Sequence, residues 1–532
     1  MKRKTPWEKT PLPKFPKVQK GPLHKHYDVI IVGAGTTGLS MAYFLKQAGK
    51  TVCVLERDTI AQGDTASTTA HLTSVTDIRL TDLAKNFGER NAHLVWQTGE
   101  TAIKEIETII NENSIDCDFE RIPGFLCTPL GSKKDLRHEI HKLQEDAALA
   151  QSFGIECQFK NDVPLYHRPG ICFANQAKFH PFKYLKGLAQ LIPGDGSDIF
   201  EHSEVTQIDS DPLVVHCEQR KIKGDYLCIA THVPLMGIAG MASAALFQTK
   251  IAPYSSYVIG ATIPKNLYPE ASYWDTTDPY YYLRVDSGKS KDFVIFGGLD
   301  HKTGQKSHPE KNYSKLETLL KKLIPEAKID TQWSGQVIET SDGLPFIGEM
   351  TQKQFIATGF CGNGITFGTF SALMVRDLLT GVKNPCAELY SPHRKSRSVW
   401  NYVKENLDYP RYMIQDRLKP LPKISAKDIQ KGEGKILKIE GQKVACSRDE
   451  DGKLHQVSAV CTHMGCLVNW NLAEKTWDCP CHGSRFTCKG AVLAGPAEEP
   501  LQVFKPEKTS KRRQKNHPQR SEIASSADAS SQ

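Results

Sequence analysis

The chain has 532 residues, 39% of them hydrophobic and 24% charged, and its formal net charge is +8 at pH 7. This length suffices for two to four domains, and the composition is ordinary for a globular protein. No stretch approaches the roughly 18–20 consecutive apolar residues of a transmembrane helix, and residues 1–26 lack the apolar core of a secretory signal. We therefore expect a cytoplasmic protein with no transmembrane segment.

The positive charge is concentrated at the two ends of the chain. Residues 1–26 hold eight Lys and Arg against one acid, residues 505–532 hold seven against three, and the body between them carries −3. We expect residues 1–26, rich in Lys and Pro, and residues 506–532 to be disordered, solvated tails. Because the body is mildly acidic, we expect no nucleic acid partner.

The first predicted βαβ unit contains a glycine motif. An apolar run of strand length, 29–32, leads into the motif at 33–38, then a helical pattern and a second strand that ends at Glu56. This arrangement predicts a dinucleotide site, because the three glycines permit a tight turn, close approach of a pyrophosphate and close packing of helix on strand. The helix N-terminus attracts the phosphates, and Glu56 binds the ribose. The expected contact residues are Gly33, Ala34, Gly35, Thr36, Thr37, Gly38, Glu56 and Arg57.

Three features together resemble the D-amino-acid oxidase and sarcosine oxidase superfamily of FAD enzymes over about 27–385. They are the single glycine motif near the front of the chain, the block rich in Gly, Ser and Thr at 63–73, and the glycine-rich turn before a helix at 357–368. The resemblance implies FAD as cofactor and adenine bound through the backbone at Val205. It also implies contacts to the flavin from Gly362, Asn363, Gly364 and Ile365, at the N-terminus of the following helix.

The same resemblance implies a fold class. We expect an α/β Rossmann-like FAD domain, built from about 27–100, 165–240 and 330–385, interleaved with an α+β substrate domain, built from about 101–164 and 241–329. The family's usual Ala-Thr-Gly turn is replaced by Ala-Thr-His ending at His232.

The substrate region gives fewer indications. Residues 280–284 and 293–300 are typical of neighbouring strands of a sheet. Arg284, at the end of an aromatic strand, is a candidate for binding a substrate carboxylate, and its alternative is an ordinary salt bridge. Tyr282 alternates with Arg284 and so faces the same side. His71 is either a neighbour of the flavin or simply packed in its loop, and the sequence indicates no catalytic base.

The pattern changes after residue 385. Residues 386–423 form a Pro-containing linker in which 399–407 is amphipathic and predicted to be a short helix. Residues 424–505 contain short strands separated by turns, which predict a small all-β domain.

Cysteine and histidine are clustered in two short segments of this last domain. The first contains Cys461, His463 and Cys466, and the second contains Cys479, Cys481 and His482. Two Cys and two His are the ligands of a Rieske 2Fe–2S cluster, in which the histidines bind one iron. The same residues in pairs are also typical of a zinc site, so both interpretations remain at this point.

The two surplus cysteines and the turn at 495–497 resemble Rieske proteins of the cytochrome bc type. That resemblance implies thiolate ligands from Cys461 and Cys479, imidazole ligands from His463 and His482, and a disulfide between Cys466 and Cys481. It also implies that Ser484 donates a hydrogen bond to a cluster sulfur. Phe486 stands where high-potential members have a Tyr donor, so we expect a moderated reduction potential.

The whole chain resembles a bacterial fusion of an FAD oxidoreductase with a C-terminal Rieske domain. This implies oxidation of the C–N bond of a small amine or amino acid, with electrons passing from flavin to cluster and on to an external acceptor, a protein or a quinone. One alternative is a reductase or oxygenase component that moves electrons the other way. Such proteins need a second nucleotide motif or a mononuclear iron domain, and the sequence shows neither. The other alternative is a redox sensor without catalysis.

Overall fold

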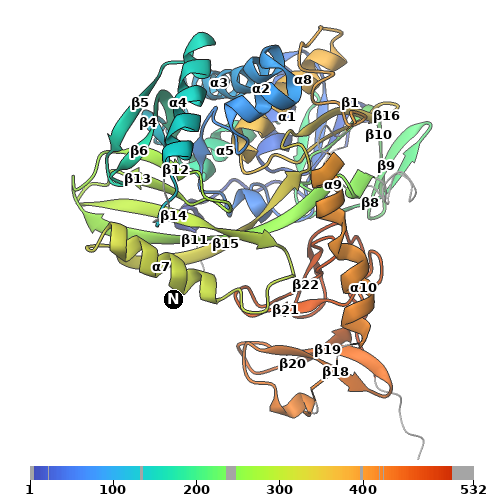
Figure 1. Ribbon diagram of the computed structural model, residues 1–532. Helices are drawn as coiled ribbons and strands as arrows, with labels where there is room; N and C mark the ends of the chain where they lie inside the picture. Colours follow the sequence, from blue (N-terminus) through green and yellow to red (C-terminus); the bar gives the residue numbers. More distant parts are fainter. Residues whose placement is uncertain are drawn as a thin grey trace, which may run out of the picture.

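The computed structural model describes residues 5–21, 23–131, 136–234, 247–395, 399–418, 420–422 and 424–505. Two large sheets and their helices form the upper body in Figure 1, and the C-terminal strands form a smaller body beneath it. Two consecutive helices, α9 (Val399–Asn406) and α10 (Asp408–Leu418), run down one side and connect the two bodies. The predicted single linker helix is therefore a pair of helices.

The first sheet has eight strands and carries the glycine motif. Its central strands are parallel, with β1 between β2 and β10, as a βαβ unit requires. The strand order is β16 (Phe346–Thr351), β17 (Gln354–Thr358), β10 (Arg220–Ile229), β1 (Tyr27–Val32), β2 (Val52–Leu55), β7 (Asp198–Phe200), with β8 (Val205–Ser210) and β9 (Leu213–Cys217) joined at β10.

The second sheet has nine strands and lies beside the first. Its order is β15 (Lys328–Thr340), β11 (Ile251–Pro264), β14 (Lys291–Lys302), β13 (Tyr282–Asp286), β12 (Ala271–Asp275), β4 (Glu120–Cys127), β6 (Arg168–Lys178), β3 (His71–Leu72), with β5 (Cys157–Val163) paired to β6. The predicted neighbours 280–284 and 293–300 pair as β13 and β14. Strands β3, β6 and β15 belong to this sheet, although their residues were expected in the FAD-binding parts. Long-range strand pairing placed them here.

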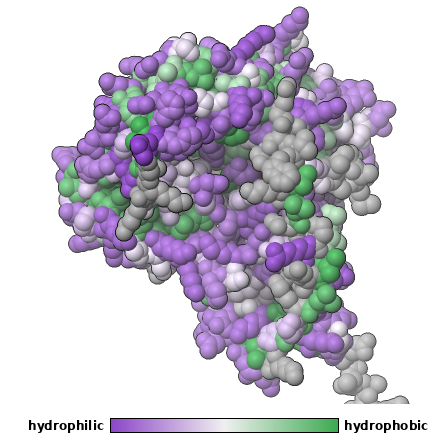
Figure 2. All heavy atoms as spheres, viewed as in Figure 1, coloured by the Kyte–Doolittle hydropathy of each residue, from purple (hydrophilic) through white to green (hydrophobic). Residues whose placement is uncertain are grey.

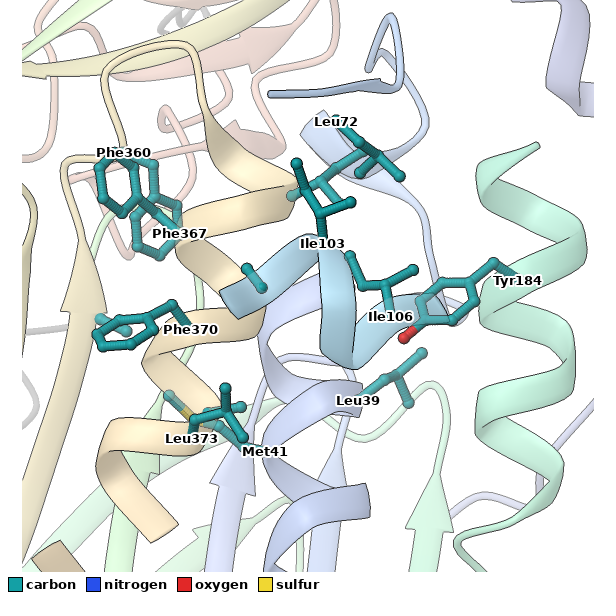
Figure 3. Packing of buried hydrophobic residues seen from close by; sticks show 14 of the residues in the cluster. Leu39, Met41, Leu72, Ile103, Ile106, Tyr184, Phe360, Phe367, Phe370 and Leu373 are labelled. Atoms are coloured by element: carbon teal, nitrogen blue, oxygen red, sulfur yellow. The ribbon is translucent and has the colours of Figure 1, made fainter. Parts of the chain in front are cut away.

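Helices pack on the first sheet and form the main core. Leu39 and Met41 from one helix, Ile103 and Ile106 from a second, and Leu373 from a third meet in Figure 3. Apolar residues at helical spacing, such as Ile103, Ile106 and Ile110, produce these buried faces. The helices of this core are α1 (Thr36–Gln47), α2 (Leu80–Phe87), α3 (Glu89–Glu112), α5 (Pro181–Gln190) and α8 (Gly364–Leu379). Two helices pack on the second sheet: α4 (Arg137–Ser152) on β5 and β6, and α7 (Lys311–Leu323) on β11 and β14.

The N-terminal segment corrects one prediction. We expected a disordered tail over residues 1–26, but residues 5–21 are ordered against the first body. Trp7 is buried and its indole Nε1 donates to the Thr68 carbonyl oxygen at 2.8 Å. Val18 is also buried, and its backbone N–H donates to Ser203 Oγ at 3.0 Å. The Lys- and Pro-rich composition suggested that the entropy cost of ordering this segment would keep it disordered. Burial of these two side chains offsets that cost. The predicted tail at 506–532 lies outside the described residues.

The C-terminal body consists of two small antiparallel sheets, in agreement with the predicted all-β domain. One contains β18 (Gly434–Ile439), β19 (Gln442–Arg448) and β20 (Leu454–Ser458); the other contains β21 (Asn469–Asn471), β22 (Thr476–Asp478), β23 (Arg485–Thr487) and β24 (Val492–Ala494). Most of the face in Figure 2 is hydrophilic, and apolar atoms appear along the side that carries α10, where Ile414 and Leu418 are exposed. Among the described helices, none is long and apolar enough to cross a membrane.

Candidate functional site

A cavity of about 960 Å³ lies between the two sheets and extends to the C-terminal body. Its walls come from the glycine motif, the turn at 231–233, strand β15, the glycine-rich turn at 360–365, and strand β24 with the loop that follows it, 492–498. The size is at the upper end of the range for small-molecule sites, about 300–1,000 Å³. The cavity is large enough for an extended cofactor together with a small substrate.

The glycine motif is shaped as its sequence predicts. Gly33 has φ +102°, and a Cβ there would lie 2.6 Å from the Ala230 carbonyl oxygen. A Cβ at Gly38 would lie 1.8 Å from the Gly33 carbonyl oxygen, so only glycine lets α1 approach β1. Because α1 begins at Thr36, its unpaired N–H groups and the positive end of its dipole face the cavity.

Glu56 holds the motif from the end of β2. Its two carboxylate oxygens accept hydrogen bonds from the backbone N–H groups of Ala34 and Asp58, both at 2.8 Å. Burial raises the pKa of this carboxyl. Glu56 therefore fixes the loop and still faces the cavity, where a ribose hydroxyl can reach it.

The structure gathers most of the predicted cofactor residues in one cavity. Ala34 and Gly38 lie behind the motif, outside the cavity lining. His232, which replaces the family's glycine, has φ +66°, a conformation that glycine adopts without strain. The predicted residues that line the cavity are Gly33, Gly35, Thr36, Thr37, Glu56, Arg57, Val205, Tyr282, Gly362, Asn363, Gly364 and Ile365.

The far end of the cavity is formed by the turn before α8. Gly362 has φ +78°, and a Cβ there would lie 2.9 Å from the hydroxyl oxygen of Tyr280 and 3.1 Å from Oδ2 of Asp77. Helix α8 starts at Gly364, so its positive end faces the cavity as well. Two helix N-termini therefore face a single cavity, one at each end.

Arg284 does not line this cavity. Its Nη1 donates to the carbonyl oxygens of Thr69 and Ala70 at 2.8 and 2.6 Å, and its Nη2 donates to the Asp286 carboxylate at 2.8 Å. The side chain is only 1% exposed. Arg284 therefore anchors the 63–73 loop to β13, and the geometry does not support the candidate role in binding a substrate carboxylate.

His71 lies in the cavity wall beside Tyr282. Its Nδ1 is 3.0 Å from Thr69 Oγ1, and its Nε2 is buried without a hydrogen-bond partner. Its ring contacts those of Trp274 and Tyr282. Burial, and then the charge of Arg284, lower the pKa of His71 to about 3, so the imidazole is neutral at pH 7.

Three carboxylates in the cavity were missed by the sequence analysis. Asp77 precedes α2, Asp300 lies on β14 and Glu339 lies on β15. Burial raises the pKa of Asp300 to about 6, and burial together with the charge of Asp300 raises that of Glu339 to about 7. The pKa of Asp77 is raised well above its usual value by burial and by the charges of Glu339 and Asp300. No local motif marks these residues, because three distant segments supply them.

The Cys and His segments form two facing loops of the C-terminal body. Cys466 and Cys481 are joined by a disulfide with an S–S distance of 2.06 Å, as the resemblance implied. The rings of His463 and His482 are 4.9 Å apart and nearly perpendicular. The sulfurs of Cys466, Cys479 and Cys481 lie within 4.8 Å of one another, but the disulfide leaves only Cys479 of these three as a thiolate ligand.

The four remaining ligand candidates suit a cluster with two thiolates and two imidazoles. Nδ1 of His463 and Nδ1 of His482 are buried without a hydrogen-bond partner, as expected of ligand atoms. Burial lowers the pKa of each imidazole to about 4, so both are neutral, which metal binding requires. A hydrogen bond from the Cys479 thiol lowers the pKa of Cys461 to about 7.

Ser484 connects the second loop to the third. Its Oγ accepts a hydrogen bond from the Ala497 N–H at 3.0 Å, so the hydroxyl proton remains available to a sulfur. A hydrogen bond from Ser484 also lowers the pKa of Cys461. Phe486 is completely buried in the same core and offers no hydroxyl.

The cluster loops rest directly on the wall of the cavity. Gln336 on β15 lines the cavity, and its Nε2 donates to the Gly483 carbonyl oxygen at 3.0 Å. Nearby, Gln305 Nε2 donates to the Pro480 carbonyl oxygen, also at 3.0 Å. From the linker, the Tyr409 ring lies 4.5 Å from the ring of His482. The two candidate sites therefore share a wall.

Two family models support this assignment, one for each half of the chain. Residues 28–378 match the model described as "DAO: FAD dependent oxidoreductase". The chain belongs to this family of FAD-dependent oxidoreductases. Residues 419–505 match the Rieske [2Fe-2S] domain. The cofactors are FAD and a Rieske 2Fe–2S cluster, and the zinc alternative is set aside.

Known proteins resemble this family member over most of its length. The "Putative Rieske 2Fe-2S iron-sulfur protein YhfW" of Bacillus subtilis is 33% identical over 92% of this chain and 95% of its own. The gamma-glutamylputrescine oxidoreductase of Escherichia coli is 24% identical over 66% of this chain and 84% of its own. The glycine oxidase structure from Geobacillus kaustophilus has a TM-score of 0.57 at 18% identity, over 70% of this chain and 100% of its own.

The residues present fit both cofactors. For FAD, the glycine cradle and two helix N-termini face a cavity of sufficient volume. For the cluster, buried imidazole nitrogens without partners and two adjacent sulfurs supply the ligand set.

Proposed function

We propose that this flavoprotein oxidises the C–N bond of a small amine or amino acid. Electrons then pass from the flavin to the Rieske cluster and on to an external acceptor, a protein or a quinone. The names of two relatives, a gamma-glutamylputrescine oxidoreductase and a glycine oxidase, support the reaction class. The cluster loops packed on the cavity wall at Gln336 support the electron route.

The proposed oxidation removes two electrons and two protons from the substrate. The substrate carbon next to nitrogen loses a hydride, which carries two electrons, and nitrogen loses a proton, so a C=N bond forms. Water then adds to that bond and yields a carbonyl compound and a free amine. FAD supplies the two-electron acceptor when it is bound. Cys461, His463, Cys479 and His482 would hold the 2Fe–2S cluster, which would supply one-electron transfer, so the two electrons of each turnover would leave one at a time.

The protein's own residues contribute binding and electrostatics. The positive end of α8, at Gly364, faces the end of the cavity lined by Gly362–Ile365 and would stabilise negative charge that develops there. The neutral imidazole of His71, with an unpartnered Nε2, offers a hydrogen-bonding group in the wall. Gln336, buried between the cavity and Gly483, holds the cluster loop against the flavin domain.

The test compares two cysteine variants of the holoprotein under anaerobic conditions. Cys479→Ser removes a cluster ligand, whereas Cys446→Ser changes a buried free cysteine of the same domain. Amines and amino acids should bleach the flavin absorbance in both variants. Only Cys446→Ser, like the natural protein, should then show the electron paramagnetic resonance signal of a reduced Rieske cluster.

Two results would contradict the proposal. Cluster reduction by NADPH alone, without any amine, would indicate that electrons flow in the opposite direction. Stable cofactors that no amine or amino acid reduces would favour a redox sensor.

A further inference from the structure

The 63–73 loop presents a row of hydroxyl groups to the cavity. Its hydroxyl-bearing residues in the lining are Thr65, Ser67, Thr68, Thr69 and Thr73. Most of this loop lies outside the two sheets, so its conformation depends on the partners that its backbone groups find elsewhere. The residues that bind its carbonyl oxygens therefore decide how the hydroxyl groups face the cofactor.

Four consecutive carbonyl oxygens of this loop, 67–70, accept hydrogen bonds from three buried side chains of distant segments. The bonds are Trp333 Nε1 to Ser67 at 2.9 Å, Trp7 Nε1 to Thr68 at 2.8 Å, and Arg284 Nη1 to Thr69 at 2.8 Å and Ala70 at 2.6 Å. All four carbonyl groups are thereby held on the side of the loop that faces the protein interior. This leaves the other side of the loop to the cavity.

Trp7 is the donor that belongs to neither sheet. It lies in the N-terminal segment, residues 5–21, and its ring also packs against Arg284, whose Cζ is 5.6 Å from the ring centroid. On its other side the ring contacts that of His180 at 5.1 Å, and His180 Nε2 lies 3.1 Å from Thr10 Oγ1. Trp7 therefore contacts both the loop and the arginine that anchors it.

The same segment holds a second part of the cavity wall, next to Glu56. The Phe15 N–H donates to the buried Glu201 carboxylate at 2.9 Å, and the Val18 N–H donates to Ser203 Oγ at 3.0 Å. Ser203 lines the cavity, and its own N–H donates to the Glu56 carbonyl oxygen at 2.8 Å. The segment is thus connected to the residue expected to bind the ribose.

We propose that the N-terminal segment positions the FAD site from behind, so that the protein binds FAD more tightly when the segment is docked. None of residues 5–21 lines the cavity, so the segment acts through the 63–73 loop and Ser203 and does not touch the cofactor. Trp7 is its main positioning residue. The inference requires FAD in the cavity and is independent of the substrate and of the direction of electron flow.

The first test measures FAD binding by the FAD-free full chain that retains its cluster. Trp7→Phe keeps an aromatic ring and removes the indole N–H. We expect the dissociation constant of FAD, measured by quenching of flavin fluorescence, to rise about two- to tenfold, which is the effect of one hydrogen bond. Trp7→Ala, which also removes the ring, should raise it further. Trp470→Phe is the matched control, because it loses an indole bond to the Gly432 carbonyl oxygen in the C-terminal body, and it should leave the dissociation constant unchanged.

The second test uses the natural chain and the reciprocity of coupled equilibria. If docking of the segment strengthens FAD binding, FAD must in turn keep the segment docked. Four exposed lysines of the segment are sites for trypsin: Lys9, Lys14, Lys17 and Lys20. Saturating FAD should slow cleavage after them by at least about twofold, the lower limit expected for Trp7→Phe. Cleavage after the exposed Lys289, on the turn between β13 and β14, should have the same rate with and without FAD.

Two results would overturn the inference. One is an unchanged dissociation constant in both Trp7 variants, even if they melt at a lower temperature, because a purely structural role reduces stability without changing affinity for FAD. The other is equal cleavage of the segment with and without FAD, and this result decides alone if the Trp7 variants do not fold. Failure of every amine to reduce the flavin would contradict the proposed function and leave this inference intact.

Discussion

At the scale of single residues, we expect the Ser484 hydroxyl to tune the reduction potential of the cluster. Ser484 Oγ accepts a hydrogen bond from the Ala497 N–H at 3.0 Å, and a hydrogen bond from Ser484 contributes to lowering the pKa of Cys461. Hydrogen bonds to cluster sulfurs stabilise the more negative, reduced state. With Phe486 in place of a second donor, we expect a potential above the roughly −400 mV of plant-type ferredoxins and below the upper Rieske limit of about +300 mV.

Ser484→Ala should lower the reduction potential of the cluster, because the reduced state loses a hydrogen bond. A redox titration followed by electron paramagnetic resonance measures the change. Ser447→Ala removes another buried hydroxyl of the same domain, which donates to the Cys488 carbonyl oxygen, and should leave the potential unchanged. An equal potential in Ser484→Ala and the natural protein would rule out the assigned role.

The half-buried carboxylates Asp300 and Glu339 predict a pH-dependent stability. The pKa values of Asp300, about 6, and Glu339, about 7, are raised above their unfolded values. At pH values between the unfolded and the folded pKa of each group, the native state binds more protons than the unfolded state. The stability that these groups contribute is therefore present below about pH 4–5 and is lost as the pH rises through 6–7. In FAD-free protein, Glu339→Gln should raise the melting temperature at pH 8 by a few degrees and have little effect at pH 5. The exposed Asp330→Asn should cause the same small change at both pH values, and a Glu339→Gln effect that is equal at both would contradict the assignment.

The cluster ligands could be predicted from the sequence, whereas the three carboxylates of the cavity could not. Cys461, His463, Cys479 and His482 occur in two short segments, and ligand spacing is a local property. The carboxylate group joins a loop before α2 with two strands of the second sheet, and no spacing rule connects residue 77 to residue 339. Arg284 was a plausible ligand for a substrate carboxylate. Its hydrogen bonds to the 63–73 loop could not be predicted, because they depend on the pairing of strands that are distant in sequence.

At the scale of elements, strand β15 connects the two halves of the molecule. Gln336 lines the cavity, and its side chain donates to both Thr303 Oγ1 and the Gly483 carbonyl oxygen. Loop 492–498 also closes part of the cavity wall. The sequence analysis did not single out β15 as a strand, and its long-range pairing with β11 places it between the two cofactor sites. The order in residues 5–21 likewise depended on partners distant in sequence.

Gln336→Leu should slow electron transfer from flavin to cluster by about tenfold, because the substitution keeps the volume and removes the hydrogen bond that holds the cluster loop. Reduction of the flavin by an amine should not change. Stopped-flow absorbance resolves the two steps. Gln332→Leu, four residues earlier on the same strand, serves as the matched control, and equal transfer rates in both variants would show that this contact does not set the rate.

At the scale of the whole molecule, the fusion places a second redox site beside the FAD site. The sequence motifs indicated the order of the two domains and their cofactors, since each domain has its own local signature. How the domains dock was beyond prediction from sequence, because the contact surface consists of loops and strand edges such as Gln305, Asn469 and Gly304. The contact between the two domains makes electron transfer between the two redox sites possible.

The most direct test of this account measures reduction of the cluster after anaerobic mixing of the holoprotein with a reducing amine, at two protein concentrations that differ tenfold. The account predicts that the flavin bleaches first, that the cluster signal follows, and that the rate constant of the second step is the same at both concentrations. A flavin that bleaches without cluster reduction would contradict the account, and so would a second step whose rate constant rises in proportion to protein concentration.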